Sequence, residues 1–179
     1  MKRLAGFCIL VLLVTLPGRS ARADGASLGI GAGVAKTEQI PDTLFLTANL
    51  RIPLVSYLVL EPEVGYWKKN YSALGLTASA EDLSFGGNAL VVIPARPLAI
   101  FGGAGVGAHR LKGTLGVPGL LSASQSETKL GIHLLAGLDV SVAPRLSLFG
   151  VGRYDIIHED SGSDHIHETK FYGGLRLGL

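Results

Sequence analysis

Along most of the chain, apolar side chains occupy every second position. The longest example runs from Leu130 to Val142, where seven alternate residues are all aliphatic or alanine. A period of two is typical of a β-strand with one apolar face. The pattern recurs in seven other segments, which are Leu28–Ala35, Leu44–Ile52, Leu58–Tyr66, Leu83–Ile93, Leu98–Arg110, Leu146–Ile156 and Lys170–Leu179. The sequence therefore predicts eight strands and an all-β fold.

The connections between these segments alternate in length. Short connections carry proline, at Pro53–Ser56, Pro94–Pro97 and Ala143–Arg145, and proline suits turns because it lacks a backbone donor. The predicted long loops are Lys36–Asp42, Lys69–Ala80, Leu111–Glu127 and His158–His165. This alternation predicts an up-and-down antiparallel barrel with all long loops at one end. Pro62 interrupts the third strand and suggests a bulge there.

Charged residues fall on the side of the strands opposite the aliphatic one. The set contains four cations and four anions, namely Arg51, Glu61, Glu63, Asp139, Arg153, Asp155, Lys170 and Arg176. Eight strands leave a lumen that side chains fill, and buried charges must be paired there. We therefore expect a transmembrane barrel with a plugged, polar lumen and no conduction. The alternative is a soluble secreted or periplasmic barrel whose Leu, Val and Ile side chains line a cavity for a small apolar ligand.

Composition narrows these alternatives. Only 17% of residues are charged, 25 are glycine, and the mean hydropathy is +0.39. Such a chain is too apolar to be disordered. Most of the predicted strands approach the roughly 9–11 residues that a tilted membrane strand needs, whereas strands in soluble proteins average about 5–6. These lengths favour the membrane barrel.

The first 23 residues have the features of a secretory signal peptide. Lys2 and Arg3 precede the apolar stretch Leu4–Leu16, and Ala21-Arg22-Ala23 fits a cleavage site. The expected domains are a cleaved signal peptide at 1–23 and an outer-membrane β-barrel domain at 24–179. Cleavage would remove the single cysteine and four basic residues, which changes the formal charge from +2 to −2. The mature chain therefore gives no reason to expect nucleic acid as a partner.

Several glycine-rich segments resemble the eight-stranded OmpA- and OmpX-like outer-membrane barrel family. They are Leu60–Tyr66, Gly102–Gly107, Gly131–Leu138, Leu148–Asp155 and Gly173–Leu179. The resemblance implies a monomer in the outer membrane of a Gram-negative cell, in contact with membrane lipid and lipopolysaccharide. The chain end is similar to the family's signal for the barrel-assembly machinery, although Leu179 replaces the usual terminal aromatic residue. Tyr57, Tyr66, Trp67 and Tyr154 are the candidates for an aromatic girdle.

The last predicted loop carries the clearest candidate chemistry. His165, His167 and Asp164 are residue types that bind zinc, and His165 and His167 would share one side of a strand. Their spacing matches no fixed metal motif, and a solvated acidic loop is the alternative. Neither His158 with Ser161 nor His109 with His133 forms a recognised catalytic motif. We expect no catalysis, no cofactor, and a role in envelope integrity or in surface interactions.

Overall fold

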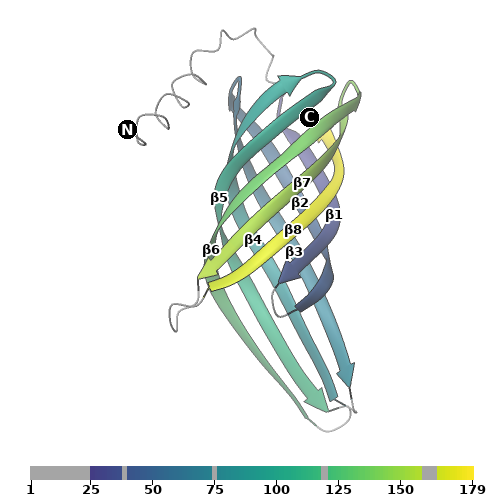
Figure 1. Ribbon diagram of the computed structural model, residues 1–179, viewed down its shortest axis with the longest axis vertical. Helices are drawn as coiled ribbons and strands as arrows, with labels where there is room; N and C mark the ends of the chain where they lie inside the picture. Colours follow the sequence, from purple (N-terminus) through teal and green to yellow (C-terminus); the bar gives the residue numbers. More distant parts are fainter. Residues whose placement is uncertain (1–24, 38–39, 74–75, 118–120, 159–164) are drawn as a thin grey trace, which may run out of the picture.

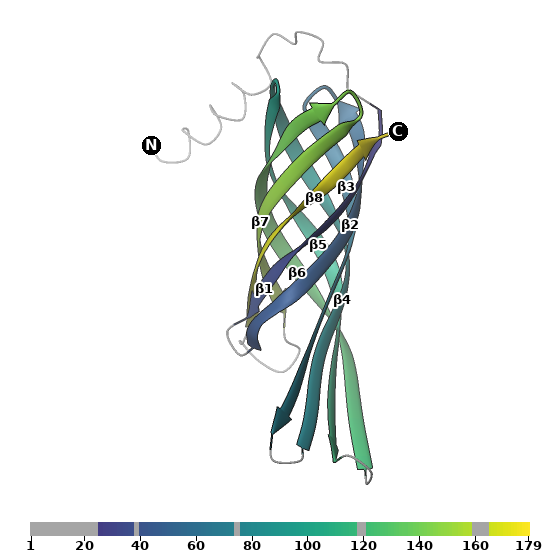
Figure 2. The same cartoon turned by 90° about the vertical axis from the view of Figure 1, so that its right-hand side faces the viewer.

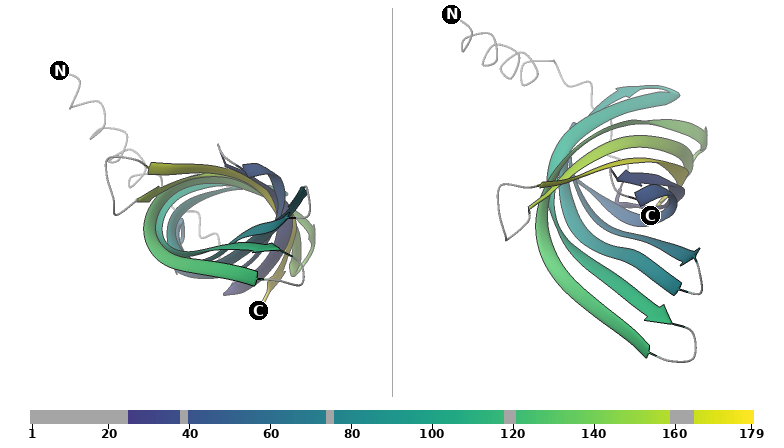
Figure 3. Two further views of the ribbon diagram at one scale, coloured as in Figure 1. Left: turned by 90° about the horizontal axis from the view of Figure 1, so that it is seen from below. Right: turned by 60° about the horizontal axis from the view of Figure 1, so that its bottom comes forward.

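The computed structural model is a closed barrel of eight antiparallel strands, as the alternation predicts. It describes residues 25–37, 40–73, 76–117, 121–158 and 165–179. The strands are β1 (Ser27–Thr37), β2 (Ile40–Val55), β3 (Leu58–Ala73), β4 (Leu76–Ala95), β5 (Leu98–Val117), β6 (Leu121–Ala143), β7 (Leu146–His158) and β8 (His165–Gly178). Each strand pairs with the next one in sequence, and β1 pairs with β8 to close the ring (Figures 1 and 3).

Within these residues, no helix combines the length and the apolar character that crossing a membrane would demand. The predicted signal peptide, residues 1–23, lies outside the described residues.

The aliphatic side of the strands faces outward. Ile30, Leu130 and Leu134 are 60%, 72% and 65% exposed, while the charged side points into the lumen. Within the described residues, the aliphatic side chains therefore do not line an internal cavity, as the soluble alternative would require. Closing the sheet pairs the strand edges that hydrocarbon would leave unsatisfied.

Two of the predicted loops are wrong, because most of their residues continue the strands. Residues 69–73 pair with 76–80, and residues 111–117 pair with 121–127, which leaves connections of only two and three residues. The cause is that alternation continues there with hydroxyl and charged residues in place of aliphatic ones. The last long connection is also shorter, since His158 pairs with His165. The Lys36–Asp42 connection shortens as well, with Thr37 paired to Ile40.

Four strands extend well beyond the closed part of the barrel (Figure 2). The pairing of β2 with β3 stops at Phe45 and Trp67, and that of β6 with β7 stops at Gly131 and Ile157. Beyond these residue pairs, β3 to β6 form a four-stranded sheet, which we call the projecting sheet. It consists of Lys68–Ala73, Leu76–Glu81, Leu111–Val117 and Leu121–Leu130. The sheet lies at the barrel end opposite the C-terminus (Figure 1).

Aromatic rings pack inside the barrel over glycines of neighbouring strands. A Cβ added to Gly65 would lie 2.8 Å from Phe45 Cε2, and one added to Gly137 would lie 2.5 Å from the Phe101 ring. These glycines therefore make room for rings in a narrow lumen. Trp67 is also inside and only 4% exposed, so its assignment to an external girdle is wrong. Pro62 stays in continuous register with β4, so the predicted bulge is absent.

Candidate functional site

The lumen is filled by ionised side chains, and all eight charges expected there are buried. At the end nearest the short turns, β2, β3, β6 and β8 supply a four-residue cluster. Arg51 Nε donates to Glu61 at 2.6 Å, and both Arg51 and Arg176 bind Asp139. Each guanidinium also stacks on an aromatic ring, with Arg51 over Phe101 at 4.0 Å and Arg176 over Phe149 at 4.5 Å. The pairing leaves this cluster neutral.

A second cluster at mid-lumen is centred on Arg153 of β7. Arg153 donates to Glu63 at 2.5 Å and to Asp155 at 2.6 Å, so that it links β3 to β7 across the lumen. The hydroxyl of Tyr172 donates to the other Glu63 oxygen at 3.0 Å. His133 Nδ1 lies 3.1 Å from Arg153 and accepts from it, because a guanidinium can only donate.

One amide joins the two clusters. Asn88 donates to Glu61 at 3.2 Å through Nδ2, and its Oδ1 accepts from the Nε2–H of His133. The network therefore runs unbroken from the short-turn end to mid-lumen. Charge-assisted hydrogen bonds of this kind are stronger than neutral ones and fix the strands relative to one another.

A third cluster lies nearest the projecting sheet. Most of its residues are not among the lumenal charges predicted from the sequence. Lys170 contacts Glu168 at 2.7 Å and Asp155 at 3.5 Å, and His109 Nδ1 lies 2.9 Å from Asp82 Oδ2. Asp82 and Glu168 were not among the expected lumenal charges, and His109 was considered only as a catalytic candidate. Alternation was the signal that could have found them, because each has the inward parity of its strand.

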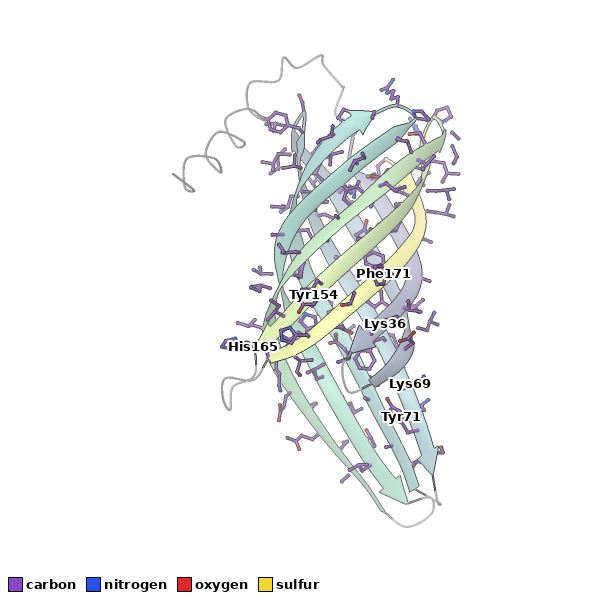
Figure 4. All side chains as sticks on the ribbon, viewed as in Figure 1. Lys36, Lys69, Tyr71, Tyr154, His165 and Phe171 are labelled. Carbon is purple, nitrogen blue, oxygen red and sulfur yellow. The ribbon has the colours of Figure 1, made fainter. Side chains whose placement is uncertain are left out.

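The histidines of the last predicted loop do not converge on one point. His165 lies against His158, with ring centroids 4.8 Å apart, whereas His167 Nδ1 is 2.9 Å from the hydroxyl of Tyr154. These side chains face outward from β7 and β8 at the rim, where Figure 4 labels Tyr154 and His165. Asp164 lies outside the described residues. Within the described residues, His165 therefore contacts His158 and His167 contacts Tyr154, as two separate pairs.

The projecting sheet carries a hollow on the face that continues the barrel's inner wall. Its volume is about 480 Å³, and its lining includes Tyr71, Ala80, Gly113, Leu115 and Ala123. Leu115 is 69% exposed. Figure 4 places Tyr71 on this sheet, away from the closed barrel. Small residues form the floor, so the hollow can accept an apolar side chain of another molecule.

Comparison with known proteins shows the fold. No family model and no curated protein matches the chain. Among solved structures, Neisserial surface protein A aligns with a TM-score of 0.64 and 13% identity, over 86% of this chain and 96% of that one. A major outer membrane protein from Thermus thermophilus gives 0.64 and 16% identity, over 85% and 97%.

A third similar structure is Ail, the attachment invasion locus protein of Yersinia pestis, solved in complex with the heparin analogue sucrose octasulfate. It aligns with a TM-score of 0.58 and 13% identity, over 85% of this chain and 96% of that one. These proteins share one architecture with the chain despite low identity. The chain therefore has the fold of the small eight-stranded outer-membrane β-barrels.

Proposed function

We propose that this protein resides in the outer membrane and binds an external protein through its projecting sheet. The observation that carries the proposal is the pair of open strand edges on that sheet. Within the described residues, Lys68–Ala73 of β3 pairs only with β4, and Leu121–Leu130 of β6 pairs only with β5. An open edge offers backbone donors and acceptors to an incoming strand.

The hollow beside these edges supports an extended polypeptide as the partner. A strand added to β3 would place alternate side chains on the hollowed face next to Tyr71, and one added to β6 would place them next to Ala123, the neighbour of Leu115. Backbone pairing would supply affinity, and the hollow would select an apolar side chain at one position of the partner.

The barrel itself acts as an anchor in this proposal. Its outward aliphatic band contacts lipid and lipopolysaccharide. The barrel-assembly machinery inserts it and recognises the end of the chain, where Leu177 and Leu179 are exposed. We propose a monomer, without catalysis, whose ion pairs plug the lumen. Large, stable steps in single-channel recordings would contradict the plug.

Selection of peptides against a truncated control tests the proposed binding. In the truncated variant, Asn-Gly turns replace residues 70–79 and 114–124, which removes the outer part of the projecting sheet with most of the hollow and leaves the closed barrel. A random peptide library is selected on the full barrel in nanodiscs and counter-selected on the truncated one. We expect enriched peptides with alternating apolar residues that slow amide exchange in 68–73 or 121–130. If no peptide is enriched, or the truncated barrel binds the peptides equally, the proposal fails.

A role in envelope integrity is the second candidate function, favoured by the paired charges that brace the closed barrel. A deletion strain that becomes sensitive to detergent provides the test. If the truncated barrel restores resistance as well as the full chain does, the barrel alone performs that role. If only the full chain restores it, the projecting sheet is required.

A further inference from the structure

Three metal-ligating side chains converge inside the barrel, next to the projecting sheet. Asp82 comes from β4, His109 from β5 and Glu168 from β8, and they are 1%, 0% and 2% exposed. One potential ligand atom from each lies within 4.8 Å of the other two. An imidazole and two carboxylates thus meet in a buried place, on the opposite face of the barrel wall from the histidines at the rim.

Each of these side chains keeps an atom without a hydrogen bond to the described residues. The atoms are Asp82 Oδ1, His109 Nε2 and Glu168 Oε1, all of them buried. Buried polar atoms in native proteins nearly always have a partner, so three such atoms in one cluster require an explanation. Asp82 Oδ2 lies 2.9 Å from His109 Nδ1, so a bound ion would take Nδ1 as its nitrogen ligand and would replace this hydrogen bond.

The formal charges of this part of the lumen are compatible with one further cation. The cluster near the short turns is neutral. Between it and the projecting sheet lie four buried carboxylates, namely Glu63, Asp82, Asp155 and Glu168. Their buried cationic neighbours are Arg153, Lys170 and Lys129. The four carboxylates exceed the cations by one formal charge if Lys129 is counted with this group. They exceed them by two if Lys129 is paired instead with Glu127, which lies 3.5 Å from its Nζ.

We propose that Asp82, His109 and Glu168 bind one divalent transition-metal ion, for which Zn²⁺ is the first probe. An imidazole nitrogen with carboxylate oxygens suits Zn²⁺, whereas Ca²⁺ and Mg²⁺ prefer oxygen ligands alone. Bonds of roughly 2.0–2.2 Å place ligand atoms about 3.3–3.6 Å apart, so atoms that now lie up to 4.8 Å apart must approach by about 1–1.5 Å, which side-chain rotation can supply. The ion would link β4 and β5 to β8 across the lumen, next to the projecting sheet.

Metal content of the refolded barrel tests this site. The three rim histidines are first removed in the background variant H158A/H165A/H167A, so that external binding does not contribute. The protein is refolded in detergent with Zn²⁺, and weakly held metal is removed by dialysis. We expect one Zn²⁺ per chain, and Co²⁺ in its place should give the visible absorption of an imidazole–carboxylate complex.

Substitutions within the cluster locate the ion. H109Q and E168Q, each made in the same background, should weaken Zn²⁺ binding by about 10- to 100-fold. The control is H133Q, since His133 is buried at mid-lumen and has both ring nitrogens in hydrogen bonds. Using two variants covers the case in which one does not fold. Absence of bound Zn²⁺ in the background variant, or equal binding by the folded H109Q or E168Q variant, would overturn the proposal.

Discussion

Arg153 allows the stabilising effect of the lumenal network to be measured. The substitution R153M keeps a long, unbranched side chain but removes the charge from between two carboxylates that are 6% and 0% exposed. Removing one partner of a buried ion pair costs about 3–5 kcal/mol, because the remaining charge stays buried without compensation. Glu63 would keep only the Tyr172 hydroxyl at 3.0 Å, whereas Asp155 would keep Lys170 at 3.5 Å.

Since Asp155 retains a cation, we expect a loss near the lower end, about 3 kcal/mol. The protein contains one tryptophan, Trp67, and its side chain is buried in the lumen. Trp67 fluorescence therefore reports opening of the barrel directly. Urea unfolding and refolding of the barrel in vesicles gives the free energy of unfolding, and the gel shift between folded and heated protein confirms the folded state.

Two further variants make the interpretation specific. R145M removes an arginine from an exposed turn and should change the free energy of unfolding by no more than about 0.5 kcal/mol. R153M/E63Q removes the stranded charge as well, and should recover at least about 1 kcal/mol relative to R153M. If R153M unfolds at the same urea concentration as R145M, or the double variant recovers nothing, the network does not stabilise the barrel as argued.

Other predictions test the packing and the position of the bilayer. A Cβ at Gly103 would collide with the backbone oxygen of Ala89, whereas one at Gly87 would meet nothing within 4 Å. G103A should therefore cost about 1–3 kcal/mol and G87A less than about 0.5, measured by the same urea titration. Leu134 lies near the middle of the outward apolar run of β6, and L134R should cost about 2–4 kcal/mol in vesicles. L115R, in the projecting sheet, should leave the free energy of unfolding nearly unchanged. If L134R and L115R lower the free energy of unfolding equally, the proposed position of the bilayer is wrong.

The sequence was sufficient for the strands and for the direction of most side chains, because alternation is a local property. It was insufficient for strand ends. Asp82 has the same parity as the inward Ser84, and Glu168 the same parity as Lys170, but each lies just before the start of the predicted strand. In the projecting sheet, most outward positions carry hydroxyl or charged residues in place of aliphatic ones. The aliphatic signal that marks the strands of the closed barrel is therefore lost where β3 to β6 project beyond it.

Contacts across the lumen lay beyond sequence reasoning for another reason. Arg153 and Glu63 are 90 residues apart and meet only because the barrel closes with a particular stagger between its strands. Trp67 shows a different limitation. Its parity placed it inside, but the preference of tryptophan for membrane interfaces suggested the outside, and the structure follows parity. A geometric rule outweighed a compositional one.

The boundary of the projecting sheet is defined twice, by pairing and by chemistry. On β6 the outward residues are aliphatic or alanine from Val142 to Leu130, and then hydroxyl-bearing at Thr128, Ser126 and Ser124. Pairing with β7 stops at Gly131, next to the same point. In the proposed membrane position, β6 therefore leaves the bilayer at this point, where it loses both its aliphatic outward residues and its pairing with β7. In that position the exposed Leu115 and the hollow around it face water, where the proposed partner strand could reach them.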